Sequence, residues 1–204
     1  MVLALASSQG FEVVTALTFD YGQRAQLQEI RATGQIAAFY QIPHQVISLP
    51  WLAGLLPEAM DSAVQEEAIK QTLHSTSETQ TVWVPNRNGV FLAIAAAFAE
   101  KEGCSHVLYG ANAEEGETFS DNTPAFTAAM TEALKYSTQT QVQVAGPVQN
   151  MTKQQMLEAA ERLEKQGNPV PLDLIWSCYR AGDTMCGQCP SCRLLQSARQ
   201  QKSA

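Results

Sequence analysis

The stretch F-E-V-V-T-A-L-T-F-D-Y-G-Q-R, Phe11 to Arg24, decides the fold class of this chain. Its first part, Phe11 to Phe19, is apolar and rich in β-branched residues, which predicts a buried strand. The polar turn Asp20-Tyr21-Gly22-Gln23 follows, and a helix is expected from about Arg24 to Tyr40. The next strand is expected at His44 to Leu49. A strand, a helix and a second strand in this order predict a parallel βαβ unit.

The same alternation continues toward the C-terminus. Helices are expected at Val2 to Ser8 with Gly10 as C-cap, Asn88 to about Glu100 with Asn88 as a possible N-cap, Phe126 to Leu134, Thr152 to about Lys165, and from near Cys192. The helix after Thr152 opens with the capping box Thr152-x-x-Gln155. Further strands are expected at His106 to Gly110 and Gln141 to Val148, and residues 57–80 are polar and expected to form a loop or a partly helical excursion. The whole pattern predicts an α/β fold with a parallel sheet.

Composition narrows the class of protein. The chain has 204 residues, 45% of them hydrophobic, which suits one domain, or one domain with a small appendage. No run approaches the roughly 20 apolar residues of a membrane helix, so no membrane partner is expected, and we expect a cytoplasmic protein. The net charge of -7 disfavours a broad nucleic-acid surface. A local basic site for ATP or another small anion stays open.

Four cysteines lie close together near the C-terminus: Cys178, Cys186, Cys189 and Cys192. Three thiolates at C-x2-C-x2-C spacing and a fourth upstream can converge on one tetrahedral Zn²⁺. An iron–sulfur cluster is the rival interpretation, because C-x2-C-x2-C also occurs in ferredoxins. A disulfide framework is not expected in a reducing cytosol. The cluster therefore predicts a structural zinc site.

Polar residues and a glycine follow the expected strands at their carboxyl ends: Asp20, Tyr21, Gln23, Arg24, Gly110 and Asn112. Ligands of open parallel sheets bind outside the carboxyl ends of the strands. The alternative is a purely structural role, in which these residues only cap helices and form turns. The planar fork of Arg24 suits a phosphate or carboxylate. Arg87, beside the expected N-terminus of a helix, could also contribute to an anion site.

Four segments match one family in order and spacing: F-D-Y-G-Q-R (Phe19 to Arg24), V-P-N-R-N (Val84 to Asn88), Y-G-A-N (Tyr109 to Asn112) and the C-x7-C-x2-C-x2-C ending. They resemble the 7-cyano-7-deazaguanine (preQ0) synthase family of queuosine biosynthesis, within the PP-loop ATP pyrophosphatase group. The resemblance implies a doubly wound, mostly parallel, Rossmann-like sheet of the adenine nucleotide alpha hydrolase type. It also implies an α/β domain at 1–170 and a small zinc-binding tail at 171–204.

The resemblance also implies a reaction. ATP with Mg²⁺ would activate the carboxylate of 7-carboxy-7-deazaguanine, ammonia would convert it to an amide, and a second ATP would drive formation of the nitrile. Substrate or nucleotide contacts are implied for Asp20, Tyr21, Gln23, Arg24, Arg87, Asn88, Gly110, Asn112 and Asp121. Asp121 could contact magnesium or the substrate, and no catalytic residue is assigned. A homodimer is expected as the habit of the family.

Two departures from the family pattern keep alternatives open. The phosphate-binding loop S-G-G-x-D-S is absent, so we expect the first strand and the loop to be missing ahead of Val2, through a late start codon or a true truncation. In the stretch Thr118 to Phe126, the family's tyrosine, cysteine and arginine are replaced by Phe119, Asn122 and Thr123. The alternatives are a catalytically impaired, truncated homologue, a zinc-stapled binding module, or ATP-dependent modification of another deazapurine.

Overall fold

The computed structural model describes residues 1–57, 60–61 and 82–202. The chain divides into two compact units. Unit 1 comprises Met1–Val14 and Asn86–Val170, and unit 2 comprises Thr15–Pro85 and Pro171–Ala204. Most of the polar stretch expected at residues 57–80 lies outside the described residues. The expected division into domains 1–170 and 171–204 stays a prediction.

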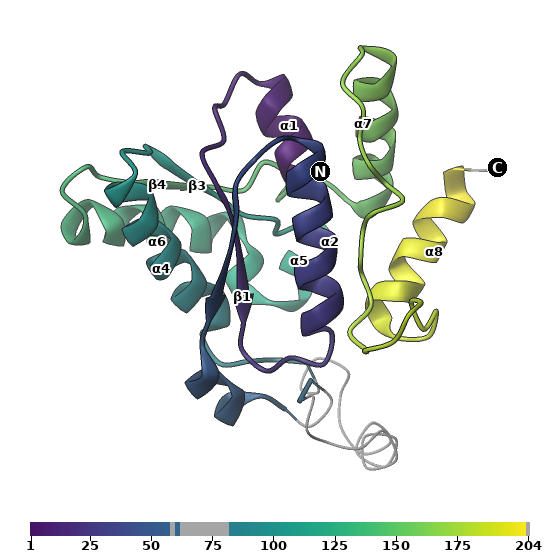
Figure 1. Ribbon diagram of the computed structural model, residues 1–204, viewed down its shortest axis with the longest axis horizontal. Helices are drawn as coiled ribbons and strands as arrows, with labels where there is room; N and C mark the ends of the chain where they lie inside the picture. Colours follow the sequence, from purple (N-terminus) through teal and green to yellow (C-terminus); the bar gives the residue numbers. More distant parts are fainter. Residues whose placement is uncertain (58–59, 62–81, 203–204) are drawn as a thin grey trace. The chain divides into compact units, whose positions relative to one another are not determined.

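Unit 2 contains the βαβ unit predicted from the opening stretch. Strand β1 (Ala16–Asp20) pairs in parallel with β2 (His44–Ser48), and helix α2 (Gln26–Phe39) connects them (Figure 1). The strand expected at Phe11 to Phe19 is shorter than predicted. A strand extends only as far as its partner, and β2 pairs no residue before Ala16. Phe11 to Val14 belong to unit 1 instead.

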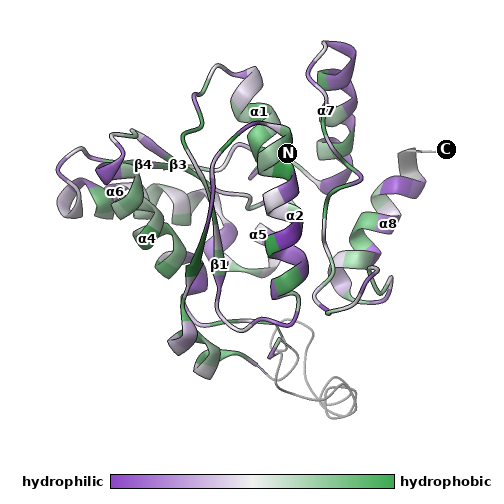
Figure 2. Ribbon diagram, viewed as in Figure 1, coloured by the Kyte–Doolittle hydropathy of each residue, from purple (hydrophilic) through white to green (hydrophobic). Residues whose placement is uncertain are grey.

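Unit 1 is built around a second parallel pair. Strand β3 (His106–Leu108) pairs with β4 (Gln143–Ala145), and α4 (Arg87–Lys101) and α6 (Pro124–Ser137) pack against them. The core of buried residues is formed by Leu92, Ala96, Ala99, Leu134, Val142 and Val144. Helix α4 is hydrophobic along most of its length (Figure 2), and its buried residues follow one face at helical spacing: Gly89, Leu92, Ala96 and Ala99.

The remaining elements of the described chain are α1 (Val2–Ser8), the 3₁₀ helix η1 (Pro50–Leu55), α5 (Ala113–Thr118), the 3₁₀ helix η2 (Ser120–Asn122), α7 (Lys153–Lys165) and α8 (Pro190–Lys202). The capping box of Thr152 and Gln155 is confirmed at the start of α7. The prediction that Asn88 caps α4 is wrong: the cap is Asn86, whose φ of 53° ends the preceding turn, and Asn88 lies inside the first helical turn.

Each unit thus contributes one pair of parallel strands joined by a helical connection, which is α2 in unit 2 and α5, η2 and α6 in unit 1. This confirms a mixed α/β fold with parallel strands. The doubly wound, Rossmann-like arrangement stays a prediction, since the described residues form two separate two-stranded sheets. Among the described residues, no helix is long and apolar enough to cross a membrane.

Candidate functional site: a cysteine metal centre and two polar groups

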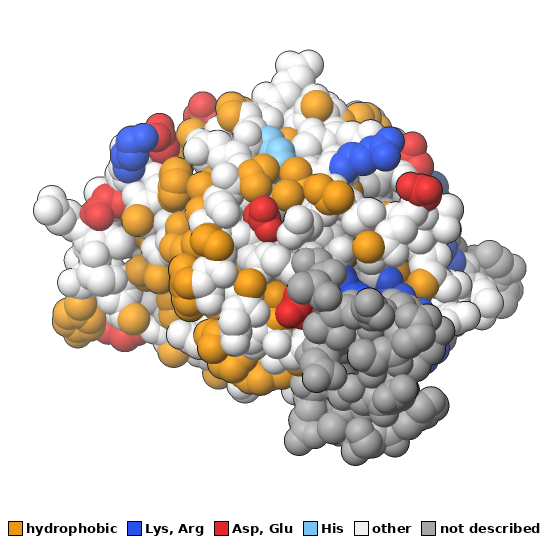
Figure 3. All heavy atoms as spheres, turned by 60° about the horizontal axis from the view of Figure 1, so that its bottom comes forward, with side chains coloured by type: hydrophobic (Ala, Val, Ile, Leu, Met, Phe, Trp, Pro, Cys, Tyr) orange, Lys and Arg blue, Asp and Glu red, His pale blue; other side chains and the backbone are white. Residues whose placement is uncertain are grey.

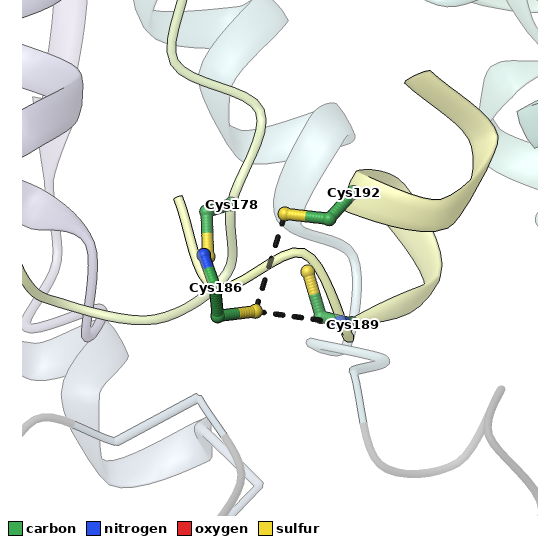
Figure 4. A group of neighbouring side chains, drawn as sticks. All are labelled: Cys178, Cys186, Cys189 and Cys192. Carbon is green, nitrogen blue, oxygen red and sulfur yellow. Dashed lines mark hydrogen bonds between the residues drawn. The ribbon is translucent and has the colours of Figure 1, made fainter. Parts of the chain in front are cut away.

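The four cysteine side chains converge at one place in unit 2 (Figure 4). Their Sγ atoms all lie within 4.8 Å of one another, and those of Cys186 and Cys192 are 4.0 Å apart. Four ligands at the zinc–sulfur bond length place tetrahedral sulfurs about 3.8 Å from each other. No disulfide joins them. The cluster can therefore hold a metal ion, and its geometry and its donors are compatible with zinc.

Backbone N–H groups around the cluster point at two of the sulfur atoms and favour their thiolate form. The N–H groups of Arg180 and Cys186 point at Cys178 Sγ at 3.3 and 3.4 Å. Those of Gln188 and Cys189 point at Cys186 Sγ, both at 3.4 Å. Burial would raise the pKa of the Cys186 thiol, but these donors and its neighbouring thiols outweigh burial and lower that pKa to about 7. A metal ligand must be deprotonated, and these contacts favour the thiolate form of Cys186.

The cluster is held in place by its surroundings in unit 2. The indole of Trp176 donates to the backbone carbonyl of Cys178 at 2.9 Å. The side chain of Gln28 on α2 donates to the carbonyl of Gly182 at 3.0 Å, which joins the cysteine loop to the βαβ part of the same unit. Pro190 opens α8 directly after Cys189, and its fixed φ suits the first helical position. The expected last helix near Cys192 is thereby confirmed.

The turn after β1 carries the first polar group, also in unit 2. Asp20 Oδ1 accepts from the N–H of Gly22 at 3.3 Å, and Gly22 has a φ of +81°. Arg24 donates from its guanidinium to the carbonyl of Asp61 at 3.1 Å. Tyr21 and Gln23 are buried, at 5% and 1% exposure, whereas Asp20 and Arg24 are partly exposed. The ligand contacts expected of these residues stay predictions.

The second polar group lies in unit 1, where the start of α4 meets η2. The amide of Asn88 donates to the carbonyl of Asp121 and to Asn122 Oδ1, both at 3.4 Å. Arg87 donates to Asn88 Oδ1 at 3.3 Å. Burial raises the pKa of the Asp121 carboxyl, and the charge of Arg87 opposes that rise. Arg87 and Asn88, which are adjacent in the sequence, are thus brought together with the distant Asp121.

Asn112 joins this group through α5. It is 3% exposed, and its side chain accepts from the N–H of Glu115 at 3.0 Å as the N-cap of α5. Glu114 accepts from the backbone N–H of Lys153 at 3.0 Å. Glu114 and Glu115 are partly buried in this helix, whereas Glu117 is exposed. The spacing Asn112-x-x-Glu115 could have predicted that helix.

Two further residues of unit 1 are buried, although the sequence alone does not mark them as site residues. Lys153, in the first turn of α7, is 8% exposed, and its charge lowers the pKa of Glu115, which burial raises. Asn122 is 7% exposed and donates to Asp121 Oδ1 at 3.0 Å. No local pattern marks either one, since both are buried by elements distant in sequence. Gly110 is exposed, and its expected ligand contact stays a prediction.

Comparison with known proteins identifies the family of this chain. A family model described as queuosine biosynthesis protein QueC matches residues 1–202. A protein of Carboxydothermus hydrogenoformans named 7-cyano-7-deazaguanine synthase is 45% identical over 195 residues, covering 94% of this chain and 88% of that protein. One of the same name from Pelotomaculum thermopropionicum is 42% identical over 200 residues, covering 95% and 88%. A third, from Methanosarcina mazei, is 36% identical over 201 residues, covering 94% and 85%. The chain therefore belongs to the QueC family of queuosine biosynthesis proteins.

Proposed function

We propose that this protein is an enzyme that converts 7-carboxy-7-deazaguanine and ammonia to 7-cyano-7-deazaguanine at the expense of ATP, in queuosine biosynthesis. The observation that carries the proposal is the identity of up to 45% with proteins named 7-cyano-7-deazaguanine synthase across 94% of this chain. The residues replaced at 119, 122 and 123 do not prevent that similarity. This identity with synthases favours an enzyme over a binding module.

The proposed chemistry follows from the poor reactivity of a carboxylate. A carboxylate oxygen attacks the α-phosphorus of ATP and releases pyrophosphate, which leaves an acyl adenylate. Ammonia then attacks the acyl carbon and expels AMP to give the amide. The amide oxygen is adenylated by a second ATP, and loss of AMP with two protons leaves the nitrile. Each step needs the phosphates, Mg²⁺ and the reactants held in register.

The two polar groups supply suitable side chains for this proposal. In unit 2, Arg24 can bind a phosphate or the substrate carboxylate through its fork, beside Asp20. In unit 1, Arg87 offers a second guanidinium, and Asp121 offers a carboxylate for Mg²⁺ or for substrate N–H groups. Asn88, Asn112 and the backbone at Gly110 complete the proposed contacts of unit 1.

We assign a structural role to the metal. Zinc held by Cys178, Cys186, Cys189 and Cys192 would have a full set of four protein ligands. A closed site of this kind leaves no position for a substrate, and its bonding energy stabilises the fold. Thiolates persist in a reducing compartment, which supports a cytoplasmic location. The doubly wound, Rossmann-like fold belongs to the same proposal, supported by a parallel strand pair in each unit.

A homodimer is a further part of the proposal. Large hydrophobic side chains of unit 2 are exposed, with Val46 on β2 at 45%, Trp51 at 58% and Leu55 at 46%. Figure 3 shows hydrophobic side chains gathered at the surface of one face of the molecule. Exposed apolar area of this kind is typical of surfaces that bind another protein. Sedimentation of the purified protein would measure its oligomeric state.

The direct test is turnover. The purified protein is incubated with ATP, Mg²⁺, ammonia and 7-carboxy-7-deazaguanine, and AMP and the nitrile are measured by chromatography and mass spectrometry. We expect both products, and none when 7-deazaguanine without the carboxylate replaces the substrate. Arg24→Ala should lose at least about tenfold in kcat/KM, because a charged hydrogen bond to the ligand is removed. Arg31→Ala, an exposed arginine on α2, is the matched control. Absence of AMP and nitrile with the unaltered protein would refute the proposal.

A further inference from the structure

The turn Asp20 to Arg24 divides into residues that face inward and residues that reach the surface. Gln23 is 1% exposed and Tyr21 is 5% exposed. Asp20 and Arg24, on either side of them, are partly exposed. Within this segment, the buried side chains can contact only the protein, whereas the partly exposed side chains can reach a ligand. A polar side chain as deeply buried as Gln23 must have its hydrogen bonds satisfied by the protein.

The side-chain amide of Gln23 makes three hydrogen bonds within unit 2. Its Oε1 accepts from the N–H of Tyr21 at 2.9 Å. Its Nε2 donates to the carbonyl of Phe19 at 3.0 Å and to Glu29 Oε2 on α2, also at 3.0 Å. Both amide hydrogens have an acceptor, so the donor capacity of the side chain is used up.

These bonds fix the backbone on both sides of Asp20. The amide of Gln23 joins the carbonyl of Phe19, at the end of β1, to the N–H of Tyr21, and Asp20 lies between them. The carboxylate of Glu29 holds this amide from the first turn of α2. Arg24 is tied by its own N–H to the carbonyl of Met60 at 2.8 Å. The directions in which Asp20 and Arg24 leave the turn are thereby set.

We infer that Gln23 and Glu29 are positioning residues, which hold Asp20 and Arg24 in the orientation that binds substrate and do not touch the substrate themselves. This inference rests on the proposed function. It revises the expectation that Gln23 contacts the ligand, and it gives Glu29 a role that the motif alone does not suggest. Glutamine is required at 23 because the position needs one acceptor and two donors, and a carboxylate or thioether cannot provide both.

The inference is tested by exchanging the amide and the carboxylate between positions 23 and 29, first one residue and then both. Gln23→Glu places a second carboxylate where the Gln23 amide donated to Glu29, so the turn should shift and KM for ATP or substrate should rise by about tenfold or more. Adding Glu29→Gln restores a hydrogen bond between the two positions with the donor reversed, and should recover much of the loss. The bond to Phe19 is not restored, so recovery is incomplete. Gln35 is exposed on α2, the helix that carries Glu29, so Gln35→Glu is the matched control and should leave KM unchanged.

The pH profile adds a measurement that a general loss of stability would not reproduce. Two facing carboxylates can share a proton, so the defect of Gln23→Glu should shrink as the pH falls. The double variant should show no such dependence. An unchanged KM in Gln23→Glu, or a loss that neither the swap nor lower pH relieves, would overturn the inference.

Hydrogen exchange separates this inference from the proposed function, because it needs no substrate. The N–H of Tyr21 is protected by Gln23, so its exchange should speed up in Gln23→Glu and slow again in the double variant. Equal exchange in all three proteins would refute the positioning role even if the enzyme is active. Conversely, a wild-type protein without turnover but with the expected exchange pattern would count against the proposed function alone.

Discussion

At the scale of single residues, the partly buried carboxyl of Glu115 is the clearest source of pH dependence in unit 1. Burial raises its pKa above the ordinary value of 4.5, and Lys153, Asn112 and Arg87 only partly oppose that rise, while the charge of Glu114 adds to it. A carboxyl that holds its proton more tightly when folded favours the folded state at low pH. This contribution is lost as the pH rises through the folded pKa.

Glu115→Gln should therefore become more stable relative to the wild type as the pH rises. Glutamine cannot ionise, so the variant avoids the cost of a buried carboxylate that the wild type bears above the folded pKa. Urea unfolding at about pH 4 and about pH 8 measures the change. Glu117→Gln, exposed on the same helix, should show no such trend. A difference in the free energy of unfolding between Glu115→Gln and the wild type that stays constant with pH would contradict the prediction.

At the scale of elements, the capping box shows how local chemistry defines a helix. The side chain of Thr152 accepts from the N–H of Gln155 at 3.2 Å, and Gln155 accepts in return from the N–H of Thr152 at 2.9 Å. Both donors would otherwise lack a partner at the start of α7. Lys153, which follows directly, is buried beside the polar group of unit 1.

Thr152→Ala should lower the free energy of unfolding by about 1 kcal/mol, because one of the two reciprocal bonds is lost. Denaturant unfolding followed by circular dichroism measures this directly. Thr140→Ala, at an exposed position, serves as the control and should change stability by less than about 0.5 kcal/mol. Equal effects of the two substitutions would mean that the box contributes nothing to α7.

At the scale of the whole molecule, the metal centre should govern the stability of the C-terminal segment. Its four ligands come from one short stretch, and the loop among them is attached to α2 through Gln28. Binding energy at such a site is folding energy, since the unfolded chain does not present the ligands together.

We expect about one zinc per chain, and a marked fall in melting temperature when a chelator removes it. Cys189→Ser should lower both the metal content and the melting temperature, because one thiolate ligand is lost. Cys104→Ala, outside the cluster, should keep the full metal content. Visible iron–sulfur absorption in place of zinc, or an unchanged melting temperature after chelation, would contradict this prediction.

Features with local causes were predictable from the sequence: the cysteine cluster from its spacing, the capping box from Thr152 and Gln155, and the first βαβ unit from an apolar, β-branched stretch followed by a helix and a second strand. Tertiary structure decided the rest, because the causes lie far apart in the chain. Pairing with β2 sets the start of β1 at Ala16. Burial by distant elements raises the pKa of the Glu115 carboxyl. Within F-D-Y-G-Q-R, the letters alone do not show that Gln23 faces inward to Glu29, since that depends on where α2 packs.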